Sequence, residues 1–284
     1  RQNVCRSNGI MGIGKVSSLA AASLSKVSRL AKLSIGKING FTASFAAAFS
    51  NTKSIDFDGT NDFLAGVGNV QIAGAGTFSW WMKTDNLTTS GNHYIMKFGE
   101  VSSNYCAIES GDLTFYWMTF DGAFDVASEH RDDYLDDGEW HHFVFTTSRP
   151  GGNGTEAISK IYLDGTEIAT KTDTRTQSPY NASKFVFGAA HTGGYGAVEC
   201  QADEMAWWDQ VALDADAITQ LYNSGAPIDL SADSGNYDNS GDLTYWWRMG
   251  DGDTYPTIED NEGSNDLTMT NMISGDIETD VPSA

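Results

Sequence analysis

The chain has 284 residues, of which 40% are hydrophobic and 12% aromatic, with 30 glycines and five prolines. This composition excludes a disordered chain, and the length suits one large all-β core better than two full domains. The formal net charge of −21 is uneven, because residues 1–53 hold eight basic and no acidic side chains while the remainder holds 9 basic and 38 acidic ones. The acidic remainder repels phosphate, which argues against nucleic-acid binding, and it attracts divalent cations.

The basic N-terminal arm, residues 1–50, contains an eleven-residue repeat: IGKVSSLAAAS, LSKVSRLAKLS, IGKINGFTASF. Eleven residues make three helical turns, but the glycines and β-branched positions favour strand and turn, so both conformations stay open. In neither can the arm bury its own apolar positions. We expect these positions to anchor the chain to copies of itself or to an acidic particle surface: Ile13, Val16, Leu24, Val27, Leu30, Ile35 and Ile38. A targeting peptide is the alternative, and Met11 is the expected natural start.

Residues 51–225 show strands separated by turns. Apolar and polar residues alternate around Phe78 and Trp80, and again around Phe143 and Phe145, so one face of each strand is predicted to enter a core. Asp164 and Gly165 separate two such runs, which predicts a β-hairpin. No run of 18 apolar residues occurs, so no membrane span is predicted.

One short helix is predicted near residues 214–225, with Asp214 as N-cap and Gly225 as the stop. The C-terminal segment, residues 226–284, is turn-rich and carries one further strand near 243–249, where Tyr245 and Trp247 alternate with polar or outward positions. Beyond Asn271 the tail is expected to be extended or loose.

Three cysteines, Cys5, Cys106 and Cys200, are an odd number without CxxC spacing, which excludes a zinc site of the usual kind. Cys106 and Cys200 lie among apolar residues. We therefore expect them to be small buried hydrophobic groups and not a disulfide.

The order of motifs resembles the concanavalin A-like, laminin-G-like jelly-roll family. The segments that carry this resemblance are SIDFDGTNDFL at residues 54–64, TFSWWMKT, DGEWHHFVFTT at 137–147, KIYLDGTEI and ADEMAWWDQVALDADAITQLYNSG. The resemblance implies an all-β fold, a two-sheet antiparallel jelly-roll sandwich.

The segment LTYWWRMGDGDTYPTIEDNEGSNDLTMTN, residues 243–271, resembles the first strand and loop of this family, but here it comes last. Either the sandwich is permuted, with this strand paired near the FDG strand, or the strand is donated to a neighbouring protomer. A displaced strand together with an arm of this kind resembles structural proteins of marine tailed bacteriophages.

Laminin-G-like domains often bind calcium at one rim. By this resemblance Asp58, Asp62 and Asp203 are the expected calcium ligands, since Ca²⁺ prefers several oxygen ligands; the alternative is that Asp58 only shapes its turn and Asp203 only accepts backbone hydrogen bonds. A ligand-binding role is expected for His191 and Tyr195 of the loop HTGGYGAVE and for Trp208, one of three Trp-Trp pairs. For each outward indole, packing against the flanking helix is the alternative.

Catalytic signatures are missing from the sequence. There is no Glu-x-Asp-x-x-Glu run of the glycosidases built on this sandwich, and no nucleophile elbow. His141 and His142 are adjacent on a strand, so they point to opposite faces and cannot hold one metal ion together.

These features predict a non-enzymatic virion structural protein, a capsid decoration or tail-fibre component, that displays a lectin-like sandwich for adhesion to a cell-surface glycan. The arm would bind other virion proteins or copies of the chain. A secreted, extracellular carbohydrate-binding or adhesion module is the alternative, and a glycoside hydrolase is a weaker one.

Overall fold

The computed structural model describes residues 4–7, 10–13, 49–66, 70–72, 75–85, 92–99, 104–109, 112–117, 124–125, 136–149, 156–173, 180–182, 184–190 and 194–284. The chain forms two compact units, Arg1–Ala48 and Phe49–Ala284. In the first unit, β1 (Val4–Ser7) and β2 (Ile10–Ile13) pair as an antiparallel hairpin. Ile13 ends β2, whereas the other expected anchoring residues of the arm lie outside the described residues.

The second unit is a sandwich of two antiparallel sheets, as predicted. The first sheet has the order β10-β9-β8-β7-β15-β4-β19-β18. Its strands are β10 (Phe124–Asp125), β9 (Asp112–Trp117), β8 (Asn104–Glu109), β7 (Asn92–Phe98), β15 (Phe185–Phe187), β4 (Phe63–Gly66), β19 (Leu267–Thr270) and β18 (Thr257–Ile258).

The second sheet has the order β13-β12-β11-β6-β16-β3-β20, and β17 pairs with β16 beside this path. Its strands are β13 (Thr166–Asp173), β12 (Ala157–Leu163), β11 (Trp140–Ser148), β6 (Gly76–Lys83), β16 (Glu199–Asp209), β3 (Ser54–Asp58), β20 (Ile277–Glu278) and β17 (Tyr245–Trp247). A separate pair joins β14 (Tyr180–Ala182) to β5 (Val70–Ile72).

The core between the two sheets is built from the alternate positions that the sequence predicted. Phe78 and Trp80 of β6 lie beside Phe145 and Phe143 of the adjacent strand β11, and all four are buried in this core. Trp80 stacks on Phe143 with ring centroids 5.4 Å apart. Cys106 and Cys200 are also buried and unbridged, as expected. The hairpin prediction is confirmed too, because Asp164 and Gly165 have the positive φ angles of 49° and 76° that a type I′ turn requires.

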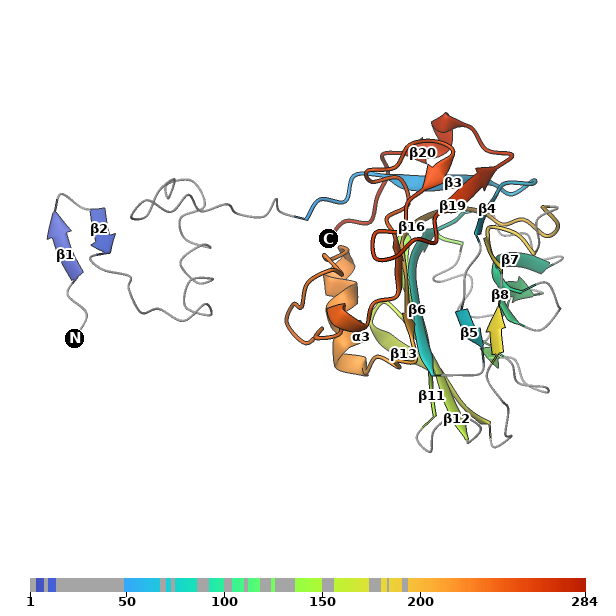
Figure 1. Ribbon diagram of the computed structural model, residues 1–284, viewed down its shortest axis with the longest axis horizontal. Coiled ribbons are helices and arrows are strands. Elements are labelled where there is room, and N and C mark those ends of the chain that lie inside the picture. The colour runs from blue at the N-terminus through green and yellow to red at the C-terminus, as the bar shows by residue number, and fades with distance from the viewer. Residues whose placement is uncertain are drawn as a thin grey trace. The chain divides into compact units, whose positions relative to one another are not determined.

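A second, smaller hydrophobic core lies on the outer face of the second sheet, beneath a covering segment that begins with a helix. Figure 1 shows α3 (Ala215–Tyr222) on the side of β6 and β16 that faces away from β7 and β8. Its N-cap is Asp214, whose carboxylate accepts a hydrogen bond from Ala217 N, as the sequence predicted. The 3₁₀ turns η1 (Asn223–Gly225) and η2 (Ser240–Asp242) follow in the segment that continues the cover. The outward residues of the sheet pack beneath this cover: Val144, Tyr162, Ala206, Trp208 and Trp246.

The C-terminal segment closes both sheets within one chain. β17 pairs with residues 205–207 of β16 and β3 pairs with residues 199–202 of the same strand, so β17 and β3 lie in line along one edge of β16. β19 pairs with β4 in the other sheet. Of the two arrangements that the sequence left open, this is the one in which the strand pairs within its own chain. In Figure 1 the red C-terminal strands accordingly lie beside the blue strands that open the sandwich.

The tail beyond Asn271 is ordered into the sandwich, contrary to the expectation of a loose end. It forms η3 (Ser274–Asp276) and then β20, which pairs with β3. Asp280 accepts hydrogen bonds from Lys83 Nζ at 2.6 Å and from Trp140 Nε1 at 3.2 Å. Met272 is buried in the core and Ile277 packs against it, so apolar burial places the tail together with main-chain pairing at an open strand edge and polar contacts.

No helix of the described residues is long and apolar enough to cross a membrane.

Candidate functional site

Two of the expected ligands, Asp58 and Asp62, meet in one turn at the rim of the sandwich. We call residues 58–62 the acidic turn. Asp58 Oδ1 accepts hydrogen bonds from Thr60 N at 2.8 Å and Asn61 N at 3.3 Å, and Asp62 Oδ2 accepts one from Asp58 N at 3.2 Å. These bonds account for the shape of the turn, but they leave further lone pairs on both carboxylates. Asp58 is exposed, whereas Asp62 is buried at 5% exposure.

The electrostatic environment of the acidic turn is strongly negative. Burial raises the pKa of Asp62 to about 6, and the neighbouring carboxylates of Asp58, Asp276 and Asp56 add to the rise. Within the described part of the chain, no ion pair joins Asp58 or Asp62 to a basic side chain. A cation or a hydrogen-bond donor from a ligand would therefore relieve the repulsion there.

The glycine-rich loop that carries Tyr195 adjoins the acidic turn. A Cβ atom on Gly194, which has φ +73°, would lie 2.9 Å from Asn61 Cα, so the loop approaches the turn as closely as only glycine permits. Two main-chain hydrogen bonds hold the loop. Tyr94 N donates to Gly196 O at 2.8 Å, and Ala190 N donates to Tyr195 O at 2.9 Å. The Tyr195 side chain is 67% exposed at this rim. His191 lies outside the described residues.

Asp203 is not part of the same group. On β16 it lies four residues beyond Glu199, which pairs with Asp58, and four strand residues span about 13 Å. Its carboxylate is fully buried and accepts hydrogen bonds from Asn51 Nδ2 at 2.7 Å and Glu204 N at 2.8 Å. Among the residues that the structure describes, no three His, Cys, Asp or Glu side chains are grouped as metal ligands. Calcium at the acidic turn stays a prediction.

Glu204 is a polar residue of β16 that the sequence reasoning missed. Its φ of 45° marks a β-bulge, where the register between β16 and β6 shifts. Its carboxylate accepts hydrogen bonds from Trp246 Nε1 at 2.6 Å and Arg248 Nε at 3.2 Å. Burial raises its pKa to about 8, although the Arg248 charge opposes the rise. The available signal was the acidic pair in the otherwise apolar run ADEMAWW and the single arginine of WWRMG.

Arg248 uses its remaining donors to hold the segment that leads into the sandwich, residues 49–52. Its Nη2 donates to Ser50 O at 2.7 Å and to Asp251 Oδ2 at 3.3 Å. The guanidinium lies over the Phe49 ring, 4.7 Å from its centroid, and over the Trp246 ring at 5.4 Å. Asp251 in turn accepts from Thr52 N at 2.8 Å. The buried acids and Arg248 therefore form a structural clamp.

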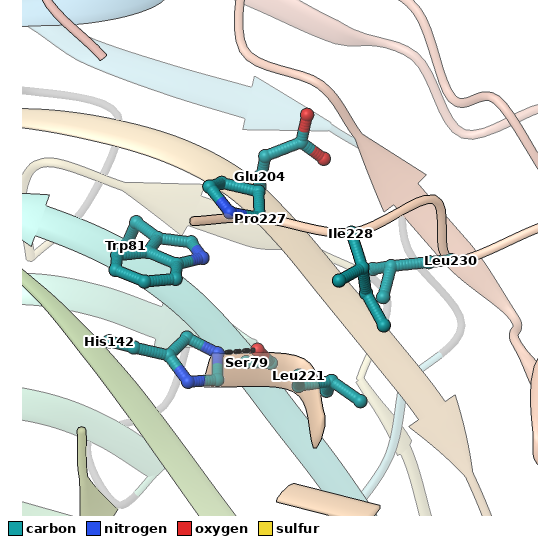
Figure 2. Close-up of a pocket in the computed structure, with 8 residues that line it drawn as sticks. All are labelled: Ser79, Trp81, His142, Glu204, Leu221, Pro227, Ile228 and Leu230. Carbon is teal, nitrogen blue, oxygen red and sulfur yellow. Dashed lines mark hydrogen bonds between the residues drawn. The ribbon is translucent and has the colours of Figure 1, made fainter. Parts of the chain in front are cut away.

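A Ser–His pair lies at a small cavity of about 10 Å³ under the cover, drawn in Figure 2. Ser79 Oγ and His142 Nε2 share a hydrogen bond of 2.8 Å, with Trp81 above them and Pro227, Ile228 and Leu230 along the covering segment. The cavity has room for about one water molecule and not for a substrate. Burial lowers the pKa of His142 to about 3, so this imidazole is neutral and structural at ordinary pH.

His141 and His142 are adjacent residues of β11, so their side chains point to opposite faces of the sheet. His141 Nδ1 is 2.7 Å from Asp164 Oδ2 and its Nε2 is 3.3 Å from Asp137 Oδ2. Burial lowers its pKa, but the two carboxylates outweigh that effect and the net pKa is raised. His141 thus fastens the Asp164 turn to β11.

Trp208 is placed differently from the expectation of a ligand contact. It is fully buried beneath the cover, and its Nε1 donates to Asn239 O at 3.3 Å. Its ring meets Tyr237 edge-on, with centroids 6.1 Å apart. Because helix α3 and the following segment occupy the outer face of the sheet, no face of this indole is available to a sugar ring, and the packing alternative is the correct one.

Comparison with known proteins adds a family match. The sequence profile of the concanavalin A-like lectin/glucanases superfamily, in its laminin-G form, matches residues 57–219, more than half of the chain. A search of curated proteins found no match.

Solved structures are similar to part of the chain at low identity. A native heptameric SAP-like pentraxin from Limulus polyphemus has 14% identity and a TM-score of 0.45, over 62% of this chain and 84% of the pentraxin. The ligand-binding domain of botulinum neurotoxin serotype D, solved with N-acetylneuraminic acid, has 13% identity and a TM-score of 0.45, over 64% of this chain and 44% of that one. The binding domain of Paraclostridial Mosquitocidal Protein 1 has 14% identity and a TM-score of 0.43, over 66% of this chain and 49% of that domain. The matched region spans less than half of each of these two toxin domains.

Proposed function

The chain belongs to the concanavalin A-like lectin/glucanases superfamily, and on that premise we propose that its sandwich is a non-enzymatic module that binds a saccharide at its rim. The proposed contacts are Tyr195 and the acidic turn. The observation that carries the proposal is an exposed aromatic ring, Tyr195, on a loop whose neighbouring residue Gly194 packs against Asn61 of the acidic turn.

This pairing of groups suits a sugar. An aromatic ring stacks on the apolar C–H face of a pyranose, while carboxylates accept hydrogen bonds from its hydroxyl groups. The described part of the loop, from Gly194 onward, needs little ordering on binding, since Gly194 packs against Asn61 and Gly196 O accepts from Tyr94 N. A preorganised loop saves the conformational entropy that a mobile one would lose.

The burial of the adjacent acids Asp203 and Glu204 favours a binding function over hydrolysis. A glycosidase needs two carboxyl groups on either side of a bond in an open site. Here the adjacent acids Asp203 and Glu204 are buried and hydrogen-bonded to Asn51, Trp246 and Arg248. The Ser79–His142 pair is enclosed as well.

Titration of the full chain with saccharides identified on a glycan array tests the rim. We expect Tyr195→Ala to weaken binding at least tenfold, about 1.4 kcal/mol, because the stacking surface is lost. Thr170→Ala, on the exposed side of β13, is the matched surface control and should bind like the parent chain. Undiminished affinity in Tyr195→Ala would exclude the rim as the site.

Calcium is part of the same proposal. Asp58 and Asp62 would supply two carboxylates and the turn its carbonyl oxygens, which is the donor type that Ca²⁺ prefers. We expect calcium to strengthen saccharide binding by the parent chain and not by Asp58→Asn. Equal affinity with calcium and with a chelator would remove the ion from the proposal.

The arm supports a finer proposal, that the module is attached to a virion as a capsid or tail component. Its apolar eleven-residue repeat, without acidic residues, is opposite in character to the acidic sandwich. Deletion of residues 11–48 retains the clamped segment 49–52, so the sandwich should fold while incorporation into particles is lost. If the truncated chain is incorporated normally, the arm is not the anchor; if the chain is found only in a secreted fraction, the extracellular adhesion module is the better description.

A further inference from the structure

A second pocket, of about 480 Å³, lies away from the rim, between the β12–β13 hairpin turn, α3 and the turn at Asn236. Its volume falls within the range of about 300 to 1,000 Å³ of small-molecule sites. The polar side chains that matter for recognition are Asp164, Asp216, Gln220, Asn223 and Asn236, together with Tyr222.

One wall of this pocket is held by the hairpin turn. A Cβ atom on Gly165 would lie 3.4 Å from Thr219 Cα, so the turn packs directly on the helix. Thr219 Oγ1 lies 3.3 Å from Gly165 O, while its shorter hydrogen bond goes to Ala215 O at 2.8 Å. The Asp164 carboxylate is fixed by His141 Nδ1 at 2.7 Å and by His142 N at 2.9 Å. The position of this acid is therefore set before any ligand arrives.

The opposite wall is the tight turn at residues 234–237. Ser234 N donates to Tyr237 O at 2.8 Å and Tyr237 N donates to Ser234 O at 3.0 Å. Tyr237 is fully buried, and its hydroxyl donates to Leu230 O at 2.9 Å. The turn is thus anchored at its base and carries exposed Asn236 near its tip.

The floor includes an aromatic ring of fixed orientation. Tyr222 stacks on Trp81, with centroids 5.9 Å apart, and lies nearly parallel to His142 at 6.4 Å and 11°. Both partners are buried. Tyr222 therefore presents the pocket with a rigid edge of mixed apolar and hydroxyl character.

The lining chemistry selects the ligand class. Side-chain amides and hydroxyls both donate and accept hydrogen bonds, and two carboxylates accept them, which complements a molecule with several hydroxyl groups. Among the described residues that line the pocket none is basic, so an anionic sugar would meet only negative charge. Within the described chain the amides of Gln220 and Asn236 make no side-chain hydrogen bond to protein. The Gln220 amide packs against Gly235, which fixes its position, and the Asn236 amide is exposed, so both have hydrogen-bonding capacity left for a ligand.

From this lining and its rigid walls we propose that the pocket is a second saccharide site, specific for neutral sugars. The inference rests on the proposed lectin-like function but uses different residues from the rim. Two sites on one sandwich would let a single chain bind two parts of a glycan, with a gain in avidity.

Side-chain amide signals in a ¹⁵N–¹H correlation spectrum of the full chain provide the test. The probes are lactose, maltose and cellobiose as neutral sugars and N-acetylneuraminic acid as the anionic one, each at millimolar concentration. We expect at least one neutral disaccharide to shift the Gln220 and Asn236 amide signals saturably, and the anionic sugar to leave them unchanged. The double variant Gln220→Ala, Asn236→Ala should weaken that binding at least tenfold, whereas Thr170→Ala should not.

The outcomes separate this inference from the rim proposal. Shifts confined to the main-chain signals of Tyr195 and residues 58–62 would overturn the second site and leave the rim standing. Shifts confined to Gln220 and Asn236 would support the second site and remove the rim. No saturable shift with any neutral sugar would overturn the second site, as would equal binding of N-acetylneuraminic acid. Thermal unfolding of the double variant checks that its pocket is still folded.

Discussion

Acidic residues occupy two contrasting regions of this sandwich. At the rim, Asp58 and Asp62 lie in a turn among other carboxylates, with no ion pair to a basic residue in the described chain. At the β16 bulge, Asp203 and Glu204 are buried and face Asn51, Trp246 and Arg248. Asp58 ends β3 and Asp62 lies in the turn after it, while Asp203 and Glu204 lie on the neighbouring strand β16. Only Asp58 of these four is exposed, so it is the one suited to meet a ligand, whereas Asp203 and Glu204 hold the chain together.

The difference shows that partners, and not residue type, decide what a carboxylate does. A buried acid without partners is costly, and Arg248 together with Trp246 Nε1 compensates Glu204 for the loss of water. The rim has no such compensation, so its repulsion persists until a ligand or an ion arrives. Three measurements would sharpen or break this contrast.

The largest effect is expected from Arg248→Ala. The substitution removes the partner of Glu204 and Asp251 and the donor to Ser50 O, so the free energy of unfolding should fall by about 4 kcal/mol. Urea unfolding at pH 9, where the Glu204 carboxyl of the folded parent chain is ionised, measures it. Lys160→Ala is the matched control, because the exposed pair of Lys160 with Glu167 should contribute less than about 1 kcal/mol. Equal losses in both variants would show that the clamp is no stronger than a surface ion pair.

A smaller effect, visible in the pH dependence, is expected from Glu204→Gln. Burial raises the pKa of Glu204 in the folded state to about 8, from an ordinary value of 4.5. The folded chain therefore holds this proton more tightly than the unfolded one, and the contribution to stability is complete below pH 4.5 and is lost as the pH rises through 8. Relative to the variant, the parent chain should lose about 3 kcal/mol between pH 5 and 9. Parallel stability curves for the two chains would mean that Glu204 is already ionised when folded.

The smallest effect belongs to the rim, in Asp62→Asn. With a folded pKa of about 6 against 3.8, Asp62 contributes stability at low pH that is lost as the pH rises from 3.8 through 6. The amide carries no charge, so the variant should be about 1 kcal/mol more stable at pH 7 and should match the parent near pH 4. Thermal unfolding at both pH values decides this. A variant less stable at pH 7 would show that the hydrogen bond from Asp58 N outweighs the repulsion.

Local sequence signals predicted much of the fold. Alternation around Phe78 and Phe143 identified the inward faces of β6 and β11, since a strand reverses its side chains at every residue. Asp164 and Gly165 marked a hairpin because few residues accept positive φ, and Asp214 marked the start of α3 because its carboxylate satisfies an amide there. The acidic turn and the Tyr195 loop were likewise visible as candidates, and the structure brings them to one rim.

Only the tertiary structure decided which outward residues are buried and which polar groups are partnered. Trp208 had the same alternating signature as a surface indole, and its burial depends on α3 and the segment after it folding back over the sheet. The bulge at Glu204 and its bond to Arg248 join positions 44 residues apart, and β20 pairs with a strand more than two hundred residues earlier. Periodicity and turn chemistry act over a few residues and so determine local structure, whereas burial and ion pairing depend on distant segments that meet only when the chain has folded.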